Sequence, residues 1–397
     1  MDYKKYFPIY SNKKDLVYLD SAASSLKPKC VIDKIDYYYN NICVNVNRGV
    51  YQLSYEATDL YEESRRRVAK FINAKEEEIV FTRGASASLN LVASSYMDFI
   101  NEGDEIITTI QEHHSSFMPW LNVSQKRKAK LVYIPLTEDG KVTVENFKKV
   151  LTNKTKVVAI NQVSNVLGYV NPIKEIAKLT HEVGAIITVD GAQSVPHMKV
   201  DVKDLDIDFL SFSGHKMCGP SGVGVLYGKY ELLQKMPPVE FGGDMAQDVF
   251  EYEMTYKDAP FKFETGTPLI SEVIALKDAI DFLENIGLDN IKKHELELKA
   301  YALEKLKDVK GITIYNNNLD SSLLTFNIDG VHPHDAASIF DKNNVCIRAG
   351  FHCAQPITRF LDQISTIRCS FYLYNDKEDV DKFVNSVIEA RDFFLSF

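Results

Sequence analysis

The sequence predicts an α/β protein, with a mainly parallel β-sheet covered by helices on both faces and a smaller α+β domain after it. Two observations predict the sheet. Between about residues 55 and 230, short apolar runs alternate with helical segments, and each run ends in polar or small residues. A third observation predicts the second domain, because the helices become longer from about residue 270.

The length of the chain also predicts more than one domain. At 397 residues it exceeds the size at which a single hydrophobic core stops growing. We expect an N-terminal segment, 1–15, that packs with the small domain, then a large domain, 16–285, and a small C-terminal domain, 286–397. Ligands in open α/β sheets bind outside the carboxyl ends of the strands, so we expect the functional site at that edge of the large domain.

The expected elements follow in chain order. A helix over 55–71 precedes strands at "EIVFT", "EIITT", "KVVAINQ", "AIITVDGA" and "FLSFSG", and Gly222-Val223-Gly224 lead into a further apolar strand. Long helices are expected over 270–286 and 290–309. The strands of the small domain are "ITIYN", "SSLLTFNID", "NVCIRAG" and "TIRCSFYLYN", and a last helix begins at Lys377.

Composition and charge limit the partners. Apolar residues make up 45% of the chain and charged residues 25%, as in ordinary globular proteins, and the formal net charge of -9 argues against nucleic acid or an anionic membrane. The N-terminus lacks the apolar region of a signal peptide, and the six cysteines form no CxxC pair. We therefore expect a cytoplasmic protein that binds small molecules or other proteins, without a metal site.

Two strand ends carry the strongest chemical signal. Lys216 follows the apolar strand "FLSFSG"; a lone lysine there is most often a solvated loop charge, but glycine, histidine and an apolar flank favour a desolvated, nucleophilic amine. Asp190 closes the strand in "AIITVDGAQ", where an aspartate alone is most often a helix cap. Pyridoxal phosphate needs both partners, a lysine that attaches it and a carboxylate that keeps its ring nitrogen protonated.

Two further segments suit the same cofactor. "TRGASASLN" places Gly84, Ser86 and Ser88 between a strand and an expected helix N-terminus, where backbone N–H groups and hydroxyls bind phosphate. Such turns are common, so this signal is weak alone. His113 in "QEHHSS" could stack on a cofactor ring, although an isolated loop histidine is more often structural.

Cys353, in the loop "AGFHCAQP", is the candidate nucleophile. A neighbouring imidazole such as His352, or the cation of Arg348, could lower the pKa of its thiol and make it reactive. The other cysteines are interpreted as structural, with Cys218 the only alternative near the lysine.

Seven ordered motifs resemble one known family. The runs "RGAS", "EHH", "QVSNVLG", "VDGAQSVPH", "FSGHKMCGPSGVGVLY", "FETGTP" and "RAGFHCAQP" look like the signature of SufS-type cysteine desulfurases, within the class V aminotransferases, from about Tyr18 to the C-terminus. The resemblance implies a homodimeric fold-type-I enzyme that binds pyridoxal 5'-phosphate. It also implies conversion of L-cysteine to L-alanine, with the sulfur held on Cys353 as a persulfide. That sulfur would supply iron-sulfur cluster assembly through a small SufE-like or SufU-like acceptor.

The resemblance also implies a role for each matching residue. Lys216, Cys353 and His113 match the catalytic residues, with His113 stacked on the cofactor. Cofactor-binding positions are matched by Lys216, Asp190, Gln193, His113, Ser86, Ala85, Ser213, His215, Asn165 and, from the other subunit, Thr267. Substrate-binding positions are matched by Arg368, Asn165 and Arg348.

The chain departs from the family pattern at three positions, Asn47, Ala85 and Phe351. Ala85 replaces a second hydroxyl, so phosphate binding there depends on Ser86 and the backbone. Within the same cofactor class, selenocysteine lyase, an aminotransferase or a kynureninase-like hydrolase are alternatives, of which the last two need no thiol. From a different class, the chain could be a sulfur carrier or scaffold without chemistry, which Lys216, Asp190 and Cys353 together argue against.

Overall fold

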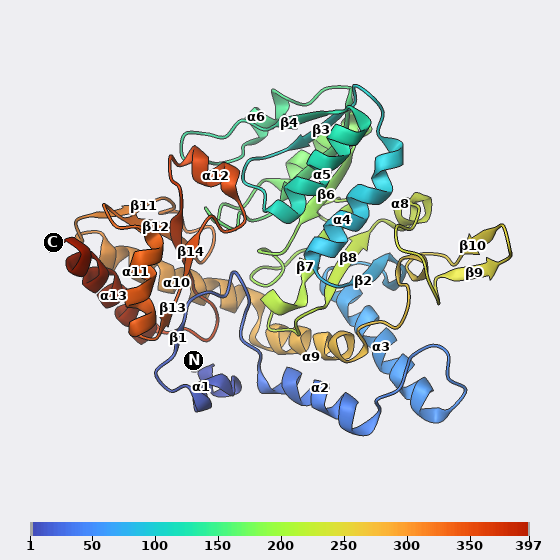
Figure 1. Ribbon diagram of the computed structural model, residues 1–397, viewed down its shortest axis with the longest axis horizontal. Coiled ribbons are helices and arrows are strands. Elements are labelled where there is room, and N and C mark those ends of the chain that lie inside the picture. Colours follow the sequence, from blue (N-terminus) through green and yellow to red (C-terminus); the bar gives the residue numbers. More distant parts are fainter. Residues whose placement is uncertain (1–2, 396–397) are drawn as a thin grey trace.

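The computed structural model describes residues 3–395 and is an α/β molecule built on two main sheets (Figure 1). Residues 1–2 of the predicted segment 1–15, and residues 396–397 of the predicted domain 286–397, lie outside the described residues. The expected boundaries between the domains stay a prediction. Within residues 3–395, no helix is both long and apolar enough to cross a bilayer.

The larger sheet has seven strands in the order β2-β8-β7-β6-β5-β3-β4. All neighbouring pairs are parallel except those of β8, which is antiparallel to β2 and β7. The expected strands are present, and β4 was not expected. In chain order the strands are β2 (Ile79–Thr82), β3 (Glu105–Thr108), β4 (Lys130–Tyr133), β5 (Thr155–Asn161), β6 (Ile186–Asp190), β7 (Phe209–Ser213) and β8 (Gly224–Gly228).

Successive residues of these strands point into two apolar layers. In β7, Phe209 joins one layer while Leu210 and Phe212 join the other. The first layer is covered by α4 (Ala85–Tyr96), α5 (His114–Arg127) and α8 (Tyr230–Lys235). The second is covered by α2 (Lys29–Asn41), α3 (Gln52–Phe71), α6 (Val144–Lys148), α7 (Ile173–Glu182) and α9 (Ile270–Ile286). Burial on both faces is why the central strands are mostly apolar, whereas β4 at the edge is only partly buried.

The smaller sheet has four antiparallel strands in the order β11-β12-β15-β14. They are β11 (Ile312–Ile314), β12 (Leu323–Ile328), β14 (Arg348–Gly350) and β15 (Thr366–Ser370). Their core includes residues of α10 (Leu288–Leu306), α11 (Pro333–Lys342) and α13 (Lys377–Leu395). A short helix, α12 (Gln355–Phe360), follows the loop that carries Cys353 and packs beside the larger sheet (Figure 1).

The N-terminal segment lies along the smaller part of the molecule. After η1 (Lys4–Tyr6) and α1 (Ile9–Asn12), β1 (Val17–Tyr18) pairs in parallel with β13 (Val345–Cys346). Lys4 Nζ lies 2.7 Å from carboxylate oxygens of both Asp376 and Asp379. These contacts bring the following residues, 19–22, next to β15.

A hairpin and four one-turn helices complete the described chain. The hairpin of β9 (Ala246–Val249) and β10 (Met254–Tyr256) projects from the body of the molecule (Figure 1). The remaining elements are the one-turn 3-10 helices η2 (Glu76–Glu78), η3 (Met97–Phe99), η4 (Gly214–Lys216) and η5 (Phe261–Phe263). Of these, η4 contains the candidate lysine.

Candidate active site

Polar residues gather where the parallel strands of the larger sheet end. Asn161 and Asp190 are paired at the ends of β5 and β6, and Ser213 ends β7. The turn Gly214–Lys216 follows at once and places Lys216 at the same edge. The sheet therefore brings together residues that are far apart in the sequence, as expected for an open α/β sheet.

Lys216 lies among charged groups from both sheets. Its side chain is half-buried, and burial lowers the pKa of its ammonium; the charge of Asp190 opposes this lowering, and Arg368 adds to it. Cys353 and Arg348 act on the same ammonium. A lysine with a lowered pKa has more of the neutral, nucleophilic amine at physiological pH than an exposed lysine has.

Asp190 is buried at the end of β6. Burial raises the pKa of its carboxyl, while the charge of Lys216 and the N–H of Ala192 oppose that rise. The Ala192 N–H donates to Oδ1 of Asp190 over 2.9 Å and fixes the carboxylate. A buried carboxylate with a lysine nearby is suited to bind one further cationic N–H group.

A glycine contact holds the expected phosphate turn in place. A Cβ on Gly224 would lie 2.3 Å from Cα of Gly84, so only glycine lets the turn rest on β8. The N–H of Ala85 then donates to Oγ of Ser213 over 2.8 Å. The first turn of α4 has N–H groups without intrahelical acceptors, which favours an anion at this end of the helix.

Ser86 and His113 are linked through Ser115. Oγ of Ser86 lies 2.6 Å from Oγ of Ser115, which lies 2.9 Å from Nδ1 of His113. Nδ1 of His113 also accepts the N–H of Ser115, so His113 caps α5 and its ring is held in one orientation. Burial, with the charge of Lys216 next in size, lowers the pKa of His113 to about 4, so the ring is neutral at physiological pH.

Arg368 and Asn165 come together between the two sheets. Nη1 of Arg368 donates to the carbonyl of Asn165 over 2.8 Å. Nε of Arg368 and Oδ1 of Asn165 are both buried without a hydrogen-bond partner in the described chain. Burial lowers the pKa of Arg368 to about 10, so its guanidinium is still charged at neutral pH. This unpartnered donor suits a bound carboxylate.

Cys353 is exposed on the short loop between β14 and α12. The loop is held at two carbonyls, because Nδ2 of Asn165 donates to His352 over 2.8 Å and the N–H of His114 donates to Cys353 over 2.8 Å. His352 and Cys353 have φ values of 54° and 53°. Two successive left-handed residues that are not glycine are uncommon and are found where the surrounding structure imposes them.

The expected activation of Cys353 by His352 is wrong. His352 is buried, its Nε2 lies 2.8 Å from Oγ1 of Thr366, and burial lowers its pKa well below the usual value. It therefore supplies no positive charge at neutral pH. The cations that interact with Cys353 are Arg348, Arg368 and Lys216.

Three other predicted residues have the following positions. Nε2 of Gln193 donates to the carbonyl of Ala22 over 2.7 Å. His215 is half-buried, and burial lowers its pKa to about 4. Thr267 is exposed and lines, together with Ser86, a hollow of 680 Å³ on the surface beside α4.

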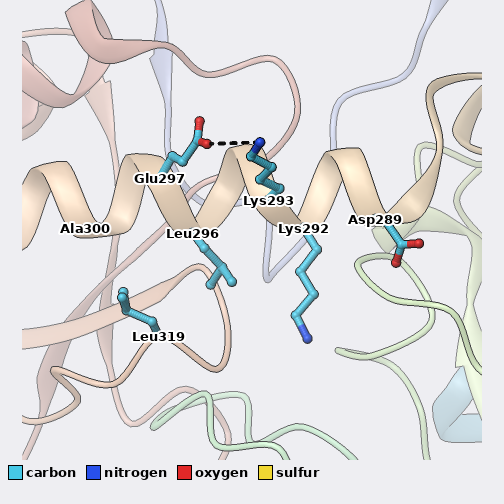
Figure 2. Close-up of a pocket in the computed structure, with 7 residues that line it drawn as sticks. All are labelled: Asp289, Lys292, Lys293, Leu296, Glu297, Ala300 and Leu319. Atoms are coloured by element: carbon cyan, nitrogen blue, oxygen red, sulfur yellow. Dashed lines mark ion pairs between the residues drawn. The ribbon is translucent and has the colours of Figure 1, made fainter.

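A second hollow, of 440 Å³, lies elsewhere on the molecule. It runs along α10, where Leu296 and Leu319 face each other and Lys293 pairs with Glu297 (Figure 2). None of the predicted site residues lines it. It therefore adds nothing to the candidate active site.

Two acidic residues at the site were missed from the sequence. Asp20 contacts Arg348 and Arg368, and the signal for it was only its position after the apolar run "LVYLD". Glu112, which directly precedes His113, is fully buried and accepts the N–H of Asn161 over 2.8 Å and Nδ2 of Asn161 over 2.7 Å. Burial raises the pKa of Glu112 to about 8.

The residues present fit pyridoxal phosphate. Lys216 can attach it, Asp190 can pair with its ring nitrogen, and the N-terminus of α4 can hold its phosphate. The unpartnered Nε of Arg368 remains for a substrate carboxylate. The α/β fold with a lysine and an aspartate at adjacent strand ends defines the class of fold-type-I pyridoxal-phosphate enzymes.

Comparisons with known proteins give the family. The model of the family "Aminotransferase class-V" matches residues 17–383. The chain is 52% identical over 396 residues to a "Probable cysteine desulfurase" of Halalkalibacterium halodurans, with 98% of each chain covered. It is 51% identical over 397 residues to a protein of the same description from Staphylococcus aureus strain Mu50, with 98% of this chain and 96% of the relative covered.

Solved structures agree with these relatives. The cysteine desulfurase CsdA of Escherichia coli superposes with a TM-score of 0.92 at 38% identity, and the apo cysteine desulfurase of Thermococcus onnurineus NA1 with a TM-score of 0.94 at 40% identity. Each alignment covers 98% of this chain and 97% of the other. The chain belongs to the class V aminotransferase family and, within it, to the cysteine desulfurases. The predicted fold is confirmed, and so is the predicted family at the level of a class V cysteine desulfurase.

Proposed function

We propose that the protein is a pyridoxal-phosphate-dependent cysteine desulfurase, a sulfurtransferase that converts L-cysteine to L-alanine and keeps the sulfur on Cys353. The observation that carries the proposal is the group of charges around Lys216, where Asp190, Arg368, Arg348 and Cys353 from both sheets act on one amine. An aminotransferase needs the first two of these partners but no thiol. The relatives described as probable cysteine desulfurases support the same activity.

Each residue has a defined task in the reaction. Arg368 and Arg348 bind the α-carboxylate of L-cysteine. When bound, pyridoxal phosphate supplies an electron sink for the negative charge that develops at the substrate α-carbon. Asp190 holds the proton on the ring nitrogen, and the amine of Lys216 takes the α-proton of the substrate. His113 is neutral, so it positions the ring without adding a positive charge to it.

Cys353 performs the sulfur transfer. Its thiolate attacks the sulfur of L-cysteine, so an S–S bond forms while the bond from that sulfur to the substrate β-carbon breaks. The electron pair of the broken bond stays with the carbon fragment, which takes up a proton and leaves as L-alanine. The balance is L-cysteine plus the Cys353 thiol giving L-alanine plus the Cys353 persulfide.

The exposure of Cys353 supports delivery to a second protein. Because the loop is held at two carbonyls, an acceptor has to approach the sulfur at the surface. We propose a small acceptor of the SufE-like or SufU-like type and a role in iron-sulfur cluster assembly. The six free cysteines suit a reducing compartment such as the cytoplasm.

We also propose that the active protein is a homodimer, in which Thr267 contributes to the phosphate site of the partner. The exposure of Thr267 supports this arrangement. Light scattering should give the mass of a dimer, and a monomer with full activity would contradict the proposal.

The test of the proposed activity is direct. Purified protein loaded with pyridoxal phosphate should release alanine from L-cysteine, and sulfide should appear in equal amount when a thiol reductant is present. Without added reductant, alanine formation should slow after about one equivalent per site, because only the thiol of excess L-cysteine can then discharge the persulfide. Absence of alanine under both conditions would refute the proposal.

A further inference from the structure

Asp20 joins the two arginines that face the candidate active site. Its Oδ2 accepts from Nη2 of Arg348 over 2.9 Å and from Nε of Arg348 over 3.2 Å. Its Oδ1 lies 3.5 Å from Nη2 of Arg368. One carboxylate thus contacts both guanidinium groups, which belong to different strands.

The arginines need such a partner because of their register. Arg348 on β14 lies directly opposite Arg368 on β15. Like charges directly opposite each other in an antiparallel pair repel, and Arg368 is buried, which reduces screening by water. Within the described residues, the carboxylate of Asp20 is the one that forms an ion pair with either of them.

Asp20 is held in position by the strand that carries Arg368. The N–H of Ser370 donates to the carbonyl of Leu19 over 2.8 Å, and Oγ of Ser370 accepts the N–H of Ala22 over 3.0 Å. Asp20 itself forms a parallel bridge with Ser370. Asp20 therefore has a fixed place beside β15, next to Ser370, which follows Arg368 by two residues.

Arg348 and Arg368 carry two positive charges and Asp20 carries one negative charge, so the three side chains together have a net charge of one positive unit that a ligand can neutralise. Nε of Arg368 is a buried donor without a hydrogen-bond partner in the described chain, and Oδ1 of Asp20 is buried without a hydrogen-bond donor. A ligand with one carboxylate neutralises the group completely. A second carboxylate would meet the negative charge of Asp20, which already pairs with both arginines.

We propose that Asp20 determines the charge selectivity of the site, so that amino acids with one carboxylate bind in preference to dicarboxylic amino acids. The inference rests on the proposed function, since it takes Arg348 and Arg368 as the binding groups for the substrate carboxylate. Asp20 acts through the arginines and is a positioning and selectivity residue.

The test compares two ligands of nearly equal size, L-asparagine and L-aspartate, which differ by one negative charge. Calorimetry on the protein loaded with pyridoxal phosphate gives a dissociation constant for each ligand without any turnover. In the wild type L-asparagine should bind more tightly. Asp20→Asn should shift the ratio of the two constants toward L-aspartate by about 10-fold or more, and the shift should shrink as salt is added.

Two further variants separate charge from folding. Asp376→Asn removes a negative charge that pairs with Lys4 away from the site, and it should leave the ratio unchanged. Arg348 is exposed, so Arg348→Gln should fold, and it should shift the ratio in the opposite direction, toward L-asparagine. An unchanged ratio in well-folded Asp20→Asn, or in Arg348→Gln if Asp20→Asn does not fold, would overturn the inference. Wild-type turnover of L-cysteine tests the proposed function separately.

Discussion

The two halves of the candidate site are built in different ways. Asp190 is buried at the end of β6, and Lys216 is half-buried in the turn directly after β7; both strands lie in the middle of the larger sheet. Cys353 stands on a loop of the smaller sheet, exposed and with a left-handed backbone. Burial shifts the pKa values of Lys216 and Asp190 in the first half. Cys353 in the second half is at the surface, where another molecule can reach it. The difference suits the tasks that we propose for them, because proton transfer gains from a dry site and sulfur delivery needs access.

The largest effect should come from the buried half. Lys216→Ala removes the amine, so the variant should lose both covalent attachment of pyridoxal phosphate and all measurable alanine formation. Borohydride reduction and peptide mass mapping measure the attachment. Lys174→Ala, which changes a surface lysine paired with Asp204, is the matched control and should behave as the wild type. Cofactor reduced onto a different lysine in the wild type would end the assignment.

Cys353→Ser should separate the two halves. The variant should still bind pyridoxal phosphate and L-cysteine, because neither step uses the thiol, but it should fail to form alanine at a useful rate since a hydroxyl cannot hold a persulfide. Absorbance of the cofactor reports binding, and mass spectrometry of the wild type should find one added sulfur on the peptide with Cys353. Cys43→Ser, at another exposed free cysteine, is the control. Full activity in Cys353→Ser would show that the thiol of Cys353 is not the sulfur acceptor.

Asp190→Asn should weaken the buried half without removing it. A neutral amide cannot hold the proton of a pyridinium nitrogen as a carboxylate does, so alanine formation should fall by roughly 10²-fold while part of the cofactor remains bound. Steady-state rates on protein of known cofactor content measure the loss. Near-normal alanine formation at full occupancy would contradict the role of Asp190.

Asn165→Ala tests the link between the halves. The variant loses the 2.8 Å hydrogen bond to the carbonyl of His352, so the Cys353 loop should be less well placed. We expect a fall in alanine formation of roughly 10-fold to 100-fold, because small displacements of a reacting group are costly. The fall should be seen with retained cofactor absorbance. If the cofactor were lost in proportion to activity, Asn165 would act through cofactor binding and not through the position of the Cys353 loop.

The smallest effect on turnover should come from Glu112→Gln, because the pKa of about 8 keeps Glu112 mostly protonated at neutral pH. This raised pKa predicts a pH dependence of stability. Between about pH 4 and pH 8 the folded state binds the proton that the unfolded state has lost. The free energy of unfolding of the wild type should therefore fall as pH rises, by up to about 1.4 kcal/mol per pH unit from this group.

Denaturation curves at several pH values measure this slope. The glutamine variant lacks the titrating group, so its slope should be smaller over the same range. Above pH 8 the two slopes should agree, since the glutamate is then ionised in both states. Equal slopes throughout the range would show that the carboxyl of Glu112 is ionised in the folded protein.

Most of the large sheet and its site could be predicted because the information is local. Apolar runs that end in polar residues gave the strands, and the edge at which Lys216 and Asp190 stand followed from the parallel arrangement. The strand Lys130–Tyr133 was missed although Leu131, Val132 and Tyr133 are apolar; it is a short strand at the edge of the sheet, and none of its residues is fully buried. Helix ends differed by two or three residues, as at Gln52 and Leu306, because capping there is not marked by a typical residue.

The sequence by itself determined which chemical groups the protein has and their order along the chain: the lysine, the aspartate, the phosphate turn and the cysteine. Only the tertiary structure decided their charge states and their partners. His352 lies next to Cys353 in sequence but is buried away as a neutral ring, whereas Asp20 reaches Arg348 across 328 positions of the chain. Burial and contacts between side chains depend on how the two sheets pack against each other. Neither can be read from which residues are adjacent in the sequence.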